Sequence, residues 1–131
     1  MIMKDVANGD ECRTQQTFAE EMQLLAEKQF AYNVANLRKR LNSFIEENKF
    51  APGQIVVWKE AMRNRSRPDN GQPAIVVEVL DPPLVNPSAA EKGSSSPYFN
   101  EPLDLIIGIL DEDGDWLTYH MDSRRFRPLE D

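Results

Sequence analysis

The sequence predicts an α+β protein, mainly β, in which an N-terminal helical segment precedes an antiparallel barrel of five strands. Between residues 18 and 48 the chain has no Gly or Pro and is rich in Ala, Leu, Glu, Gln, Lys and Arg, which favour helices. After residue 53, short runs of β-branched and aliphatic residues alternate with turn signals. This second pattern is typical of a small all-β unit whose short strands close on one another.

We expect three segments along the chain. Residues 1–16 are polar with little hydrophobic periodicity, so we expect a disordered or frayed N-terminus. Residues 17–49 form the helical segment, as one long helix or two. Thr17 and Glu20 have the spacing of a capping box, in which each side chain satisfies a backbone amide at the start of a helix. Residues 52–131 form the barrel.

Large apolar residues follow two stripes along the helical segment. Each stripe advances in steps of three and four residues, which places its members on one helix face. The first stripe is Phe18, Met22 and Leu25, and the second is Phe30, Val34, Leu37, Leu41 and Phe44. Because a step of five residues separates the stripes, the helix breaks or turns its buried face near Lys28 and Gln29, or its halves pack on different partners. Either this face packs against the barrel, or the helix 18–48 forms a homodimer.

Four apolar runs and one short terminal run are the expected strands of the barrel. They are residues 54–58, 74–80, 103–110, 116–121 and 127–129. Residues 68–71 supply a turn before the second run, and the Asp-Gly pair at 113–114 supplies a tight hairpin, because Asn, Asp and Gly tolerate positive φ. Asp122 or Ser123 caps one helical turn before the last run. The Pro- and Ser-rich residues 81–102 form a long irregular loop.

This order of elements resembles that of SH3-like small β-barrels over about residues 52–129. Residues 52–58, with residues 72–77 after them, are similar to the way in which several such families begin. Examples are PWWP and Tudor-type readers, KOW-type RNA-binding modules and MazF-type toxin endoribonucleases. The resemblance implies a barrel that binds something, since few barrels of this size catalyse reactions, but a shared fold does not transfer function.

Particular residues separate these families. MazF-type toxins have a stretch similar to residues 71–76, yet they use an arginine with a Ser or Thr hydroxyl just after the second strand. This chain has Asp-Pro-Pro at residues 81–83 instead, so a toxin-type ribonuclease is the weaker alternative. PWWP and Tudor readers hold a methylammonium in an aromatic cage. The rings available for a cage are Trp58, Tyr98, Phe99, Trp116 and Tyr119, although most aromatic residues of a small barrel form its core.

Motifs for metal binding or acid–base chemistry are weak. Residues 111–115 resemble an acidic calcium loop, but glycine is fourth instead of sixth and the twelfth position is Asp122, so a solvated hairpin tip is preferred. His120 is the only histidine, and no nucleophile accompanies it in the sequence pattern. We therefore expect a protein that is not an enzyme, with no catalytic residue, metal or cofactor.

Charge and composition limit the classes of partner. The formal net charge is −7, and residues 51–131 hold eight basic and fourteen acidic side chains, so this half would repel phosphate unless it has a local basic patch. No apolar run approaches the roughly 20 residues of a membrane-spanning helix, so we expect no membrane partner. A lone cysteine, Cys12, cannot form an internal disulfide, which suits a reducing compartment and indicates a cytoplasmic protein.

Basic and aromatic side chains of the barrel loops are the candidate binding residues. They are Lys59, Arg63, Arg65, Arg67, Tyr98, Phe99, Arg124 and Arg125. The arginines at 63–67 alternate and so share one face of an extended chain. The arginines at 124–125 precede the last strand, which lies beside the first in SH3-like barrels, so the two clusters would merge. Arginine binds carboxylates and phosphates through paired contacts, and the domain's own acidic residues are the competing partners.

These observations favour a non-enzymatic interaction or adaptor module. Its binding surface would combine the loops at 59–72 and 81–102 with the arginines at 124–125, and a protein partner is the leading expectation. The helix 18–48 would form a homodimer. The alternative is a nucleic-acid-binding or regulatory protein that uses the merged arginine patch, with a steep salt dependence of binding.

Overall fold

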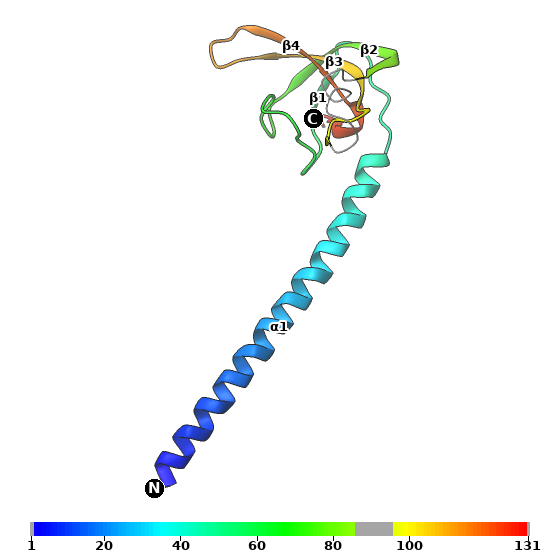
Figure 1. Ribbon diagram of the computed structural model, residues 1–131. Coiled ribbons are helices and arrows are strands. Elements are labelled where there is room, and N and C mark those ends of the chain that lie inside the picture. Colours follow the sequence, from blue (N-terminus) through cyan, green and yellow to red (C-terminus); the bar gives the residue numbers. More distant parts are fainter. Residues whose placement is uncertain (1, 86–95, 131) are drawn as a thin grey trace. The chain divides into compact units, whose positions relative to one another are not determined.

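A computed structural model describes residues 2–85 and 96–130, and the side chains of residues 17–85 and 96–130 (Figure 1). The elements are α1 (Ile2–Ile45), β1 (Ile55–Trp58), β2 (Ala74–Val85), β3 (Pro102–Leu110), β4 (Trp116–Met121), a 3₁₀ turn η1 (Ser123–Arg125) and β5 (Phe126–Pro128). The chain divides into two compact units, one up to Leu41 and the other from Asn42 onward. The predicted α+β class is confirmed: one N-terminal helix precedes a five-stranded antiparallel sheet.

The helix α1 is a single uninterrupted element of 44 residues. Its start at Ile2 differs from the predicted start at Thr17, so the capping-box pair lies inside the helix. A Ser/Thr-x-x-Glu pattern marks the start of a helix only where the residues before it are not helical. Residues 10–16 contain no Gly or Pro that would stop helix formation. The break considered near Lys28 and Gln29 is absent from α1, and Gln29 donates a hydrogen bond of 3.0 Å to Asn33 one turn later.

The apolar side chains of α1 are exposed along the described part of the helix. Phe18 is 63% exposed, Phe30 is 72% exposed and Leu37 is 70% exposed. A helix this long gains most of its stability in water from packing of an apolar face, because propensity alone leaves isolated helices marginal. These residues are therefore available to an additional partner.

The strands form one sheet in the order β4-β3-β2-β1-β5, with every neighbouring pair antiparallel. β1 lies between β2 and the short β5, as expected if the last strand neighbours the first. The tight hairpin between β3 and β4 is present, and Gly114 at its tip has φ +82°. The Asp111 carboxylate accepts hydrogen bonds from the amides of Asp113 and Asp115, each at 2.9 Å, which closes the turn.

β2 is longer than predicted. The run was expected to end at Leu80, before two prolines, but the strand continues to Val85. The pairing of β2 with β3 is irregular between Val79 and Leu84, so the prolines lie where the ladder is already interrupted. Proline is tolerated at such irregularities because no ladder hydrogen bond is lost there. The predicted loop 81–102 is correspondingly shorter, and its residues 86–95 lie outside the described residues.

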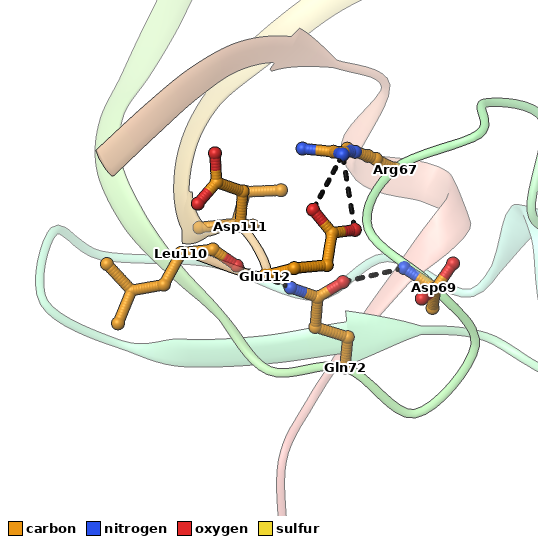
Figure 2. Close-up of a pocket in the computed structure, with 7 residues that line it drawn as sticks. Arg67, Asp69, Gln72, Leu110, Asp111 and Glu112 are labelled. Atoms are coloured by element: carbon orange, nitrogen blue, oxygen red, sulfur yellow. Dashed lines mark hydrogen bonds and ion pairs between the residues drawn. The ribbon is translucent and has the colours of Figure 1, made fainter. Parts of the chain in front are cut away.

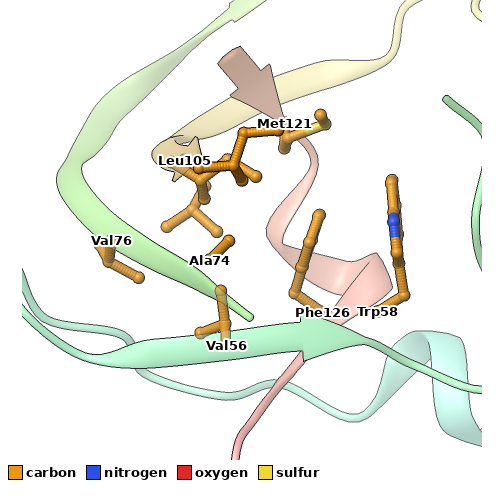
Figure 3. Packing of buried hydrophobic residues seen from close by; sticks show 9 residues of the cluster. Val56, Trp58, Ala74, Val76, Leu105, Met121 and Phe126 are labelled. Carbon is orange, nitrogen blue, oxygen red and sulfur yellow. The ribbon is translucent and has the colours of Figure 1, made fainter. Parts of the chain in front are cut away.

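The core lies within the unit from Asn42 onward and is formed by all five strands (Figure 3). Its members are Val56, Trp58, Ala74, Val76, Leu105, Ile107, Ile109, Met121 and Phe126. The rings of Trp58 and Phe126 stack with their centroids 4.2 Å apart. The Trp58 indole also donates a 2.6 Å hydrogen bond to the carbonyl of Pro68, which fixes the loop after β1 to the core.

Candidate functional site

The candidate residues lie on three connected segments of one unit. We call residues 59–72, between β1 and β2, the arm. The structure brings the arm together with the turn at residues 96–101 and with η1. The arm thus contacts both segments, through Arg65 to Glu101 and through Arg125 to the carbonyl of Met62, whereas the merging of the two arginine clusters stays a prediction.

Arg65 joins the arm to the turn before β3. Its guanidinium lies 2.5 Å from the carboxylate of Glu101, which is only 7% exposed, and 4.3 Å from the centre of the Tyr98 ring. Asn64 donates a 2.8 Å hydrogen bond to the other Glu101 oxygen, and the Tyr98 hydroxyl donates to the Asn64 carbonyl at 3.2 Å. A buried carboxylate with two donors holds the turn firmly on the arm.

Arg125 joins η1 to the start of the arm. Its guanidinium donates to the carbonyl of Met62 at 3.0 Å, and its own carbonyl accepts from the amide of Lys59 at 2.8 Å. The guanidinium groups of Arg124 and Arg125 lie over the ring of Phe44, at 4.4 and 5.2 Å from its centre. Cation–π contacts of this kind favour arginine on an aromatic face.

Acidic side chains of the same unit neutralise the other arginines. Arg67 makes a two-pronged contact with Glu112, at 2.9 and 3.2 Å, and Arg63 lies 3.7 Å from Asp69. Arg124 contacts Asp122 at 2.7 Å, and this hydrogen bond raises the pKa of Arg124. Of the two interpretations open from the sequence, the geometry therefore favours arginines that pair with the domain's own carboxylates. Arg63, Arg65, Arg67 and Arg124 are therefore members of ion pairs and do not form a free cationic patch.

Lys59 is not part of an exposed binding surface. It is only 3% exposed, and its ammonium group donates hydrogen bonds to the carbonyls of Ser43 and Glu46, the latter at 3.0 Å. Carbonyls at the end of a helix lack intrahelical donors, and a lysine satisfies them and the negative end of the helix dipole. Burial lowers the pKa of Lys59, and the nearby carboxylates of Glu46 and Asp122 oppose this effect. The sequence placed this residue at the edge of the patch because it could not show the burial.

The two candidate aromatic residues have different surroundings. Tyr98 is half-buried and its ring is covered on one face by Arg65. Phe99 is 39% exposed at the surface of the turn. Two rings considered for an aromatic cage belong to the core instead, since Trp58 stacks on Phe126 and Tyr119 packs against the buried cluster.

A small pocket of about 190 Å³ lies between the arm and the β3–β4 hairpin (Figure 2). Arg67 and Glu112 face one another across it as an ion pair. Gln72 donates to the carbonyl of Leu110 at 3.0 Å and accepts from the amide of Asp69 at 2.9 Å. The polar side chains of Arg67, Glu112 and Gln72 thus have partners within the pocket lining. These contacts hold the arm against the β3–β4 hairpin.

The carboxylates of Asp111, Asp113 and Asp115 form the acidic group at the hairpin tip, with one oxygen of each within 4.8 Å of the others. One Asp111 oxygen already accepts from two backbone amides, in keeping with the interpretation as a hairpin tip. His120 is exposed on β4, where it pairs in register with Ile106.

One exposed feature was missed by sequence reasoning. The face of the sheet opposite the core carries a row of Ile55, Ile75 and Gly108, which pair with one another across β1, β2 and β3. The indole of Trp116 lies directly over Gly108 and is 56% exposed. The alternation of side chains along β4 could have revealed this feature. Leu117, Tyr119 and Met121 face the core, so the residues between and before them, including Trp116, face away from it.

Comparison of the chain with protein-family models, with curated proteins and with solved structures finds no match. In the part of the chain that the structure describes, no helix has both the length and the apolar character needed to cross a membrane.

Proposed function

We propose that the protein is a non-enzymatic interaction module of the cytoplasm that assembles as a homodimer through α1 and binds a protein partner through the loops of its sheet-containing unit. One observation carries this proposal: the large apolar side chains of α1 are exposed to solvent. They are Phe18, Met22, Leu24, Leu25, Phe30, Leu37, Leu41 and Ile45, each at least 50% exposed.

Burial of these side chains would supply ample free energy for association. Removing a Leu, Phe or Met side chain from water contributes about 1.5–3 kcal/mol, and a dimer would bury both copies of those residues that lie on its contact face. A stretch of this size is larger than the scattered apolar contacts of ordinary protein surfaces, and such patches mark interaction sites. The ordering of side chains and the loss of translational freedom reduce the net free energy of association. A few buried apolar residues are sufficient to offset these costs.

The loop surface supports a protein partner over a nucleic acid. The arm and the turn at 96–101 form one continuous surface through the Arg65–Glu101 pair, and Phe99 is exposed on it. Aromatic and arginine side chains are enriched in the cores of protein interfaces, and Phe99 and Arg65 supply both kinds on this surface. Phosphate binding is strongest at cationic groups that are not neutralised, and Arg63, Arg65, Arg67 and Arg124 each lie against a carboxylate. Nucleic-acid binding is therefore the second candidate, and a toxin-type ribonuclease the third.

We further propose that the sheet is an SH3-like barrel. The strand order, in which β1 lies between β2 and β5, supports this assignment. The 3₁₀ turn directly before the last strand supports it as well. The fold alone does not name the partner.

Light scattering of matched variants tests the proposal. The wild-type chain is expected to have a mass of about 30 kDa, twice the 15.0 kDa of one chain. The double variant Phe30→Glu with Leu37→Glu places charges on the exposed stripe and should reduce the mass to that of one chain, because buried unpaired charges are costly. The control, Ala35→Glu with Asn42→Glu, has the same spacing and charge on exposed residues away from the stripe, and should remain a dimer.

A wild-type mass of 15.0 kDa at high concentration would contradict the homodimer. Equal loss of association in both double variants would show that net charge, and not the apolar stripe, is responsible. Titration of fluorescent single-stranded RNA and duplex DNA at low salt tests the second candidate. Tight binding with a steep salt dependence would replace the protein-partner proposal.

A further inference from the structure

Six apolar residues of α1 are placed symmetrically about the point between residues 29 and 30. Their numbers add up to 59 in pairs: Phe18 with Leu41, Met22 with Leu37, and Leu25 with Val34. Apart from the half-buried Val34, all of them are more than 50% exposed. A sequence with this symmetry can place a large apolar side chain opposite another one when two copies run in opposite directions.

The charges of the same stretch are separated along the helix. From Thr17 to residue 27 the charged residues are Glu20, Glu21 and Glu27, all acidic, whereas from residue 28 to Ile45 they are Lys28, Arg38, Lys39 and Arg40, all basic. The rule that pairs the apolar residues also pairs these charges. It places Glu21, which flanks the first stripe, opposite Arg38, which flanks the second, whereas Glu20 and Lys39 lie at matching levels but on the faces away from the stripes.

We propose that two copies of α1 pair in antiparallel orientation, with residue i of one copy opposite residue 59 − i of the other. This arrangement deepens the homodimer proposed above and rests on it. A parallel pair in register would place Glu21 beside its own copy and Arg38 beside its own copy. Like charges so placed disfavour that orientation, whereas opposite charges across an interface select the antiparallel one.

The step of five residues between the two stripes is consistent with this geometry. Leu25 and Val34 are nine residues apart, which is about 2.5 helical turns, so they lie on different sides of the helix. Helices that cross near residues 29 and 30 can bury the first stripe of each copy against the second stripe of the other. Crossing of packed helices at a defined angle is the general rule, since side-chain ridges of one helix fit the grooves of the other.

Cysteine cross-linking of the full-length protein distinguishes the two orientations. In a Cys12→Ser background, Gln29→Cys should cross-link to its own copy under mild oxidation or with a short thiol-reactive linker, because position 29 lies near the symmetry centre. Met22→Cys alone and Leu37→Cys alone should not, since the two copies of either position lie about 22 Å apart along the axis. An equimolar mixture of these two variants should form a covalent heterodimer.

Charge exchange gives a second, independent measurement. Glu20→Lys with Glu21→Lys should weaken self-association roughly tenfold, and so should Arg38→Glu with Lys39→Glu, because each leaves like charges facing one another. A mixture of the two double variants should form heterodimers of restored affinity. In a parallel dimer the mixture would not restore affinity, and Met22→Cys would cross-link to itself.

The outcomes of these experiments distinguish failure of the homodimer from failure of the antiparallel orientation. A wild-type chain of 15.0 kDa removes the homodimer and the antiparallel arrangement together. A dimer in which Met22→Cys and Leu37→Cys each cross-link to themselves, and in which the charge-exchanged mixture stays weak, overturns the antiparallel arrangement alone.

Discussion

Lys59 connects the end of α1 with the first strand of the sheet. Its ammonium group donates to the carbonyls of Ser43 and Glu46, and its backbone amide donates to Arg125. Because the side chain is buried, water cannot replace these donors if the ammonium is removed. This single residue therefore stabilises the junction between a helix end, a strand and η1.

Replacement of Lys59 by an isosteric apolar side chain should be costly. Lys59→Met leaves two carbonyls without their donor, so the free energy of unfolding should fall by about 1–3 kcal/mol. Urea denaturation monitored by tryptophan fluorescence measures it, with the exposed Lys49→Met as the matched control. A loss no larger than that of the control would show that the lysine is a surface residue in solution.

Gly108 permits the close approach of Trp116 on the outer face of the sheet. A methyl group at this position would lie 1.9 Å from the indole, closer than atoms can approach. Gly108→Ala should therefore displace the ring and destabilise the unit by about 1–3 kcal/mol, as other overpacked positions do.

A double-mutant cycle isolates this contact. In a Trp116→Ala background the added methyl group has no ring to displace, so Gly108→Ala should cost much less there than in the wild type. Chemical denaturation of the four proteins supplies the cycle. Equal costs in both backgrounds would contradict the contact and point to the backbone conformation of β3 instead.

At the scale of elements, the sequence predicted those turns and caps that depend only on neighbouring residues. The Asp-Gly pair identified the β3–β4 hairpin, and Asp122 was identified as a possible cap of η1, where its carboxylate accepts from the Arg124 amide at 3.0 Å. The boundaries of β2 and α1 were not predicted, since β2 continues past two prolines and α1 begins before the capping-box pair that was expected to start it. Whether Pro82 ends a strand depends on the pairing irregularity with β3, which is a property of two strands and not of one.

The sequence placed the segments of the candidate site near one another but did not show how its charges pair. The sequence indicated that the arm, the turn at 96–101 and η1 belong to one surface. It did not indicate that Arg65 pairs with Glu101 or Arg67 with Glu112, because these partners lie 36 and 45 residues apart. Such pairings depend on strand register and loop geometry, and they decide whether an arginine cluster is a cationic patch or an internal network.

At the scale of the whole molecule, the two units differ in the burial of their side chains. The unit from Asn42 onward has its own core, in which Leu105, Ile107 and Phe126 are completely buried. The unit up to Leu41 is helix whose described side chains are nearly all exposed, and nothing in its own sequence forms a core. In the proposed function, the unit from Asn42 onward binds the partner and the unit up to Leu41 forms the homodimer.

Hydrogen–deuterium exchange tests the central claim most directly, namely that a second copy stabilises α1. In the wild type the amides of residues 18–41 should be protected. In Phe30→Glu with Leu37→Glu their protection should fall by at least about tenfold, because an isolated helix opens readily. The amides of β3, which lie in the core of the other unit, should exchange equally slowly in both proteins. If residues 18–41 remain as protected in this variant as in the wild type, association does not stabilise α1 and the account is contradicted.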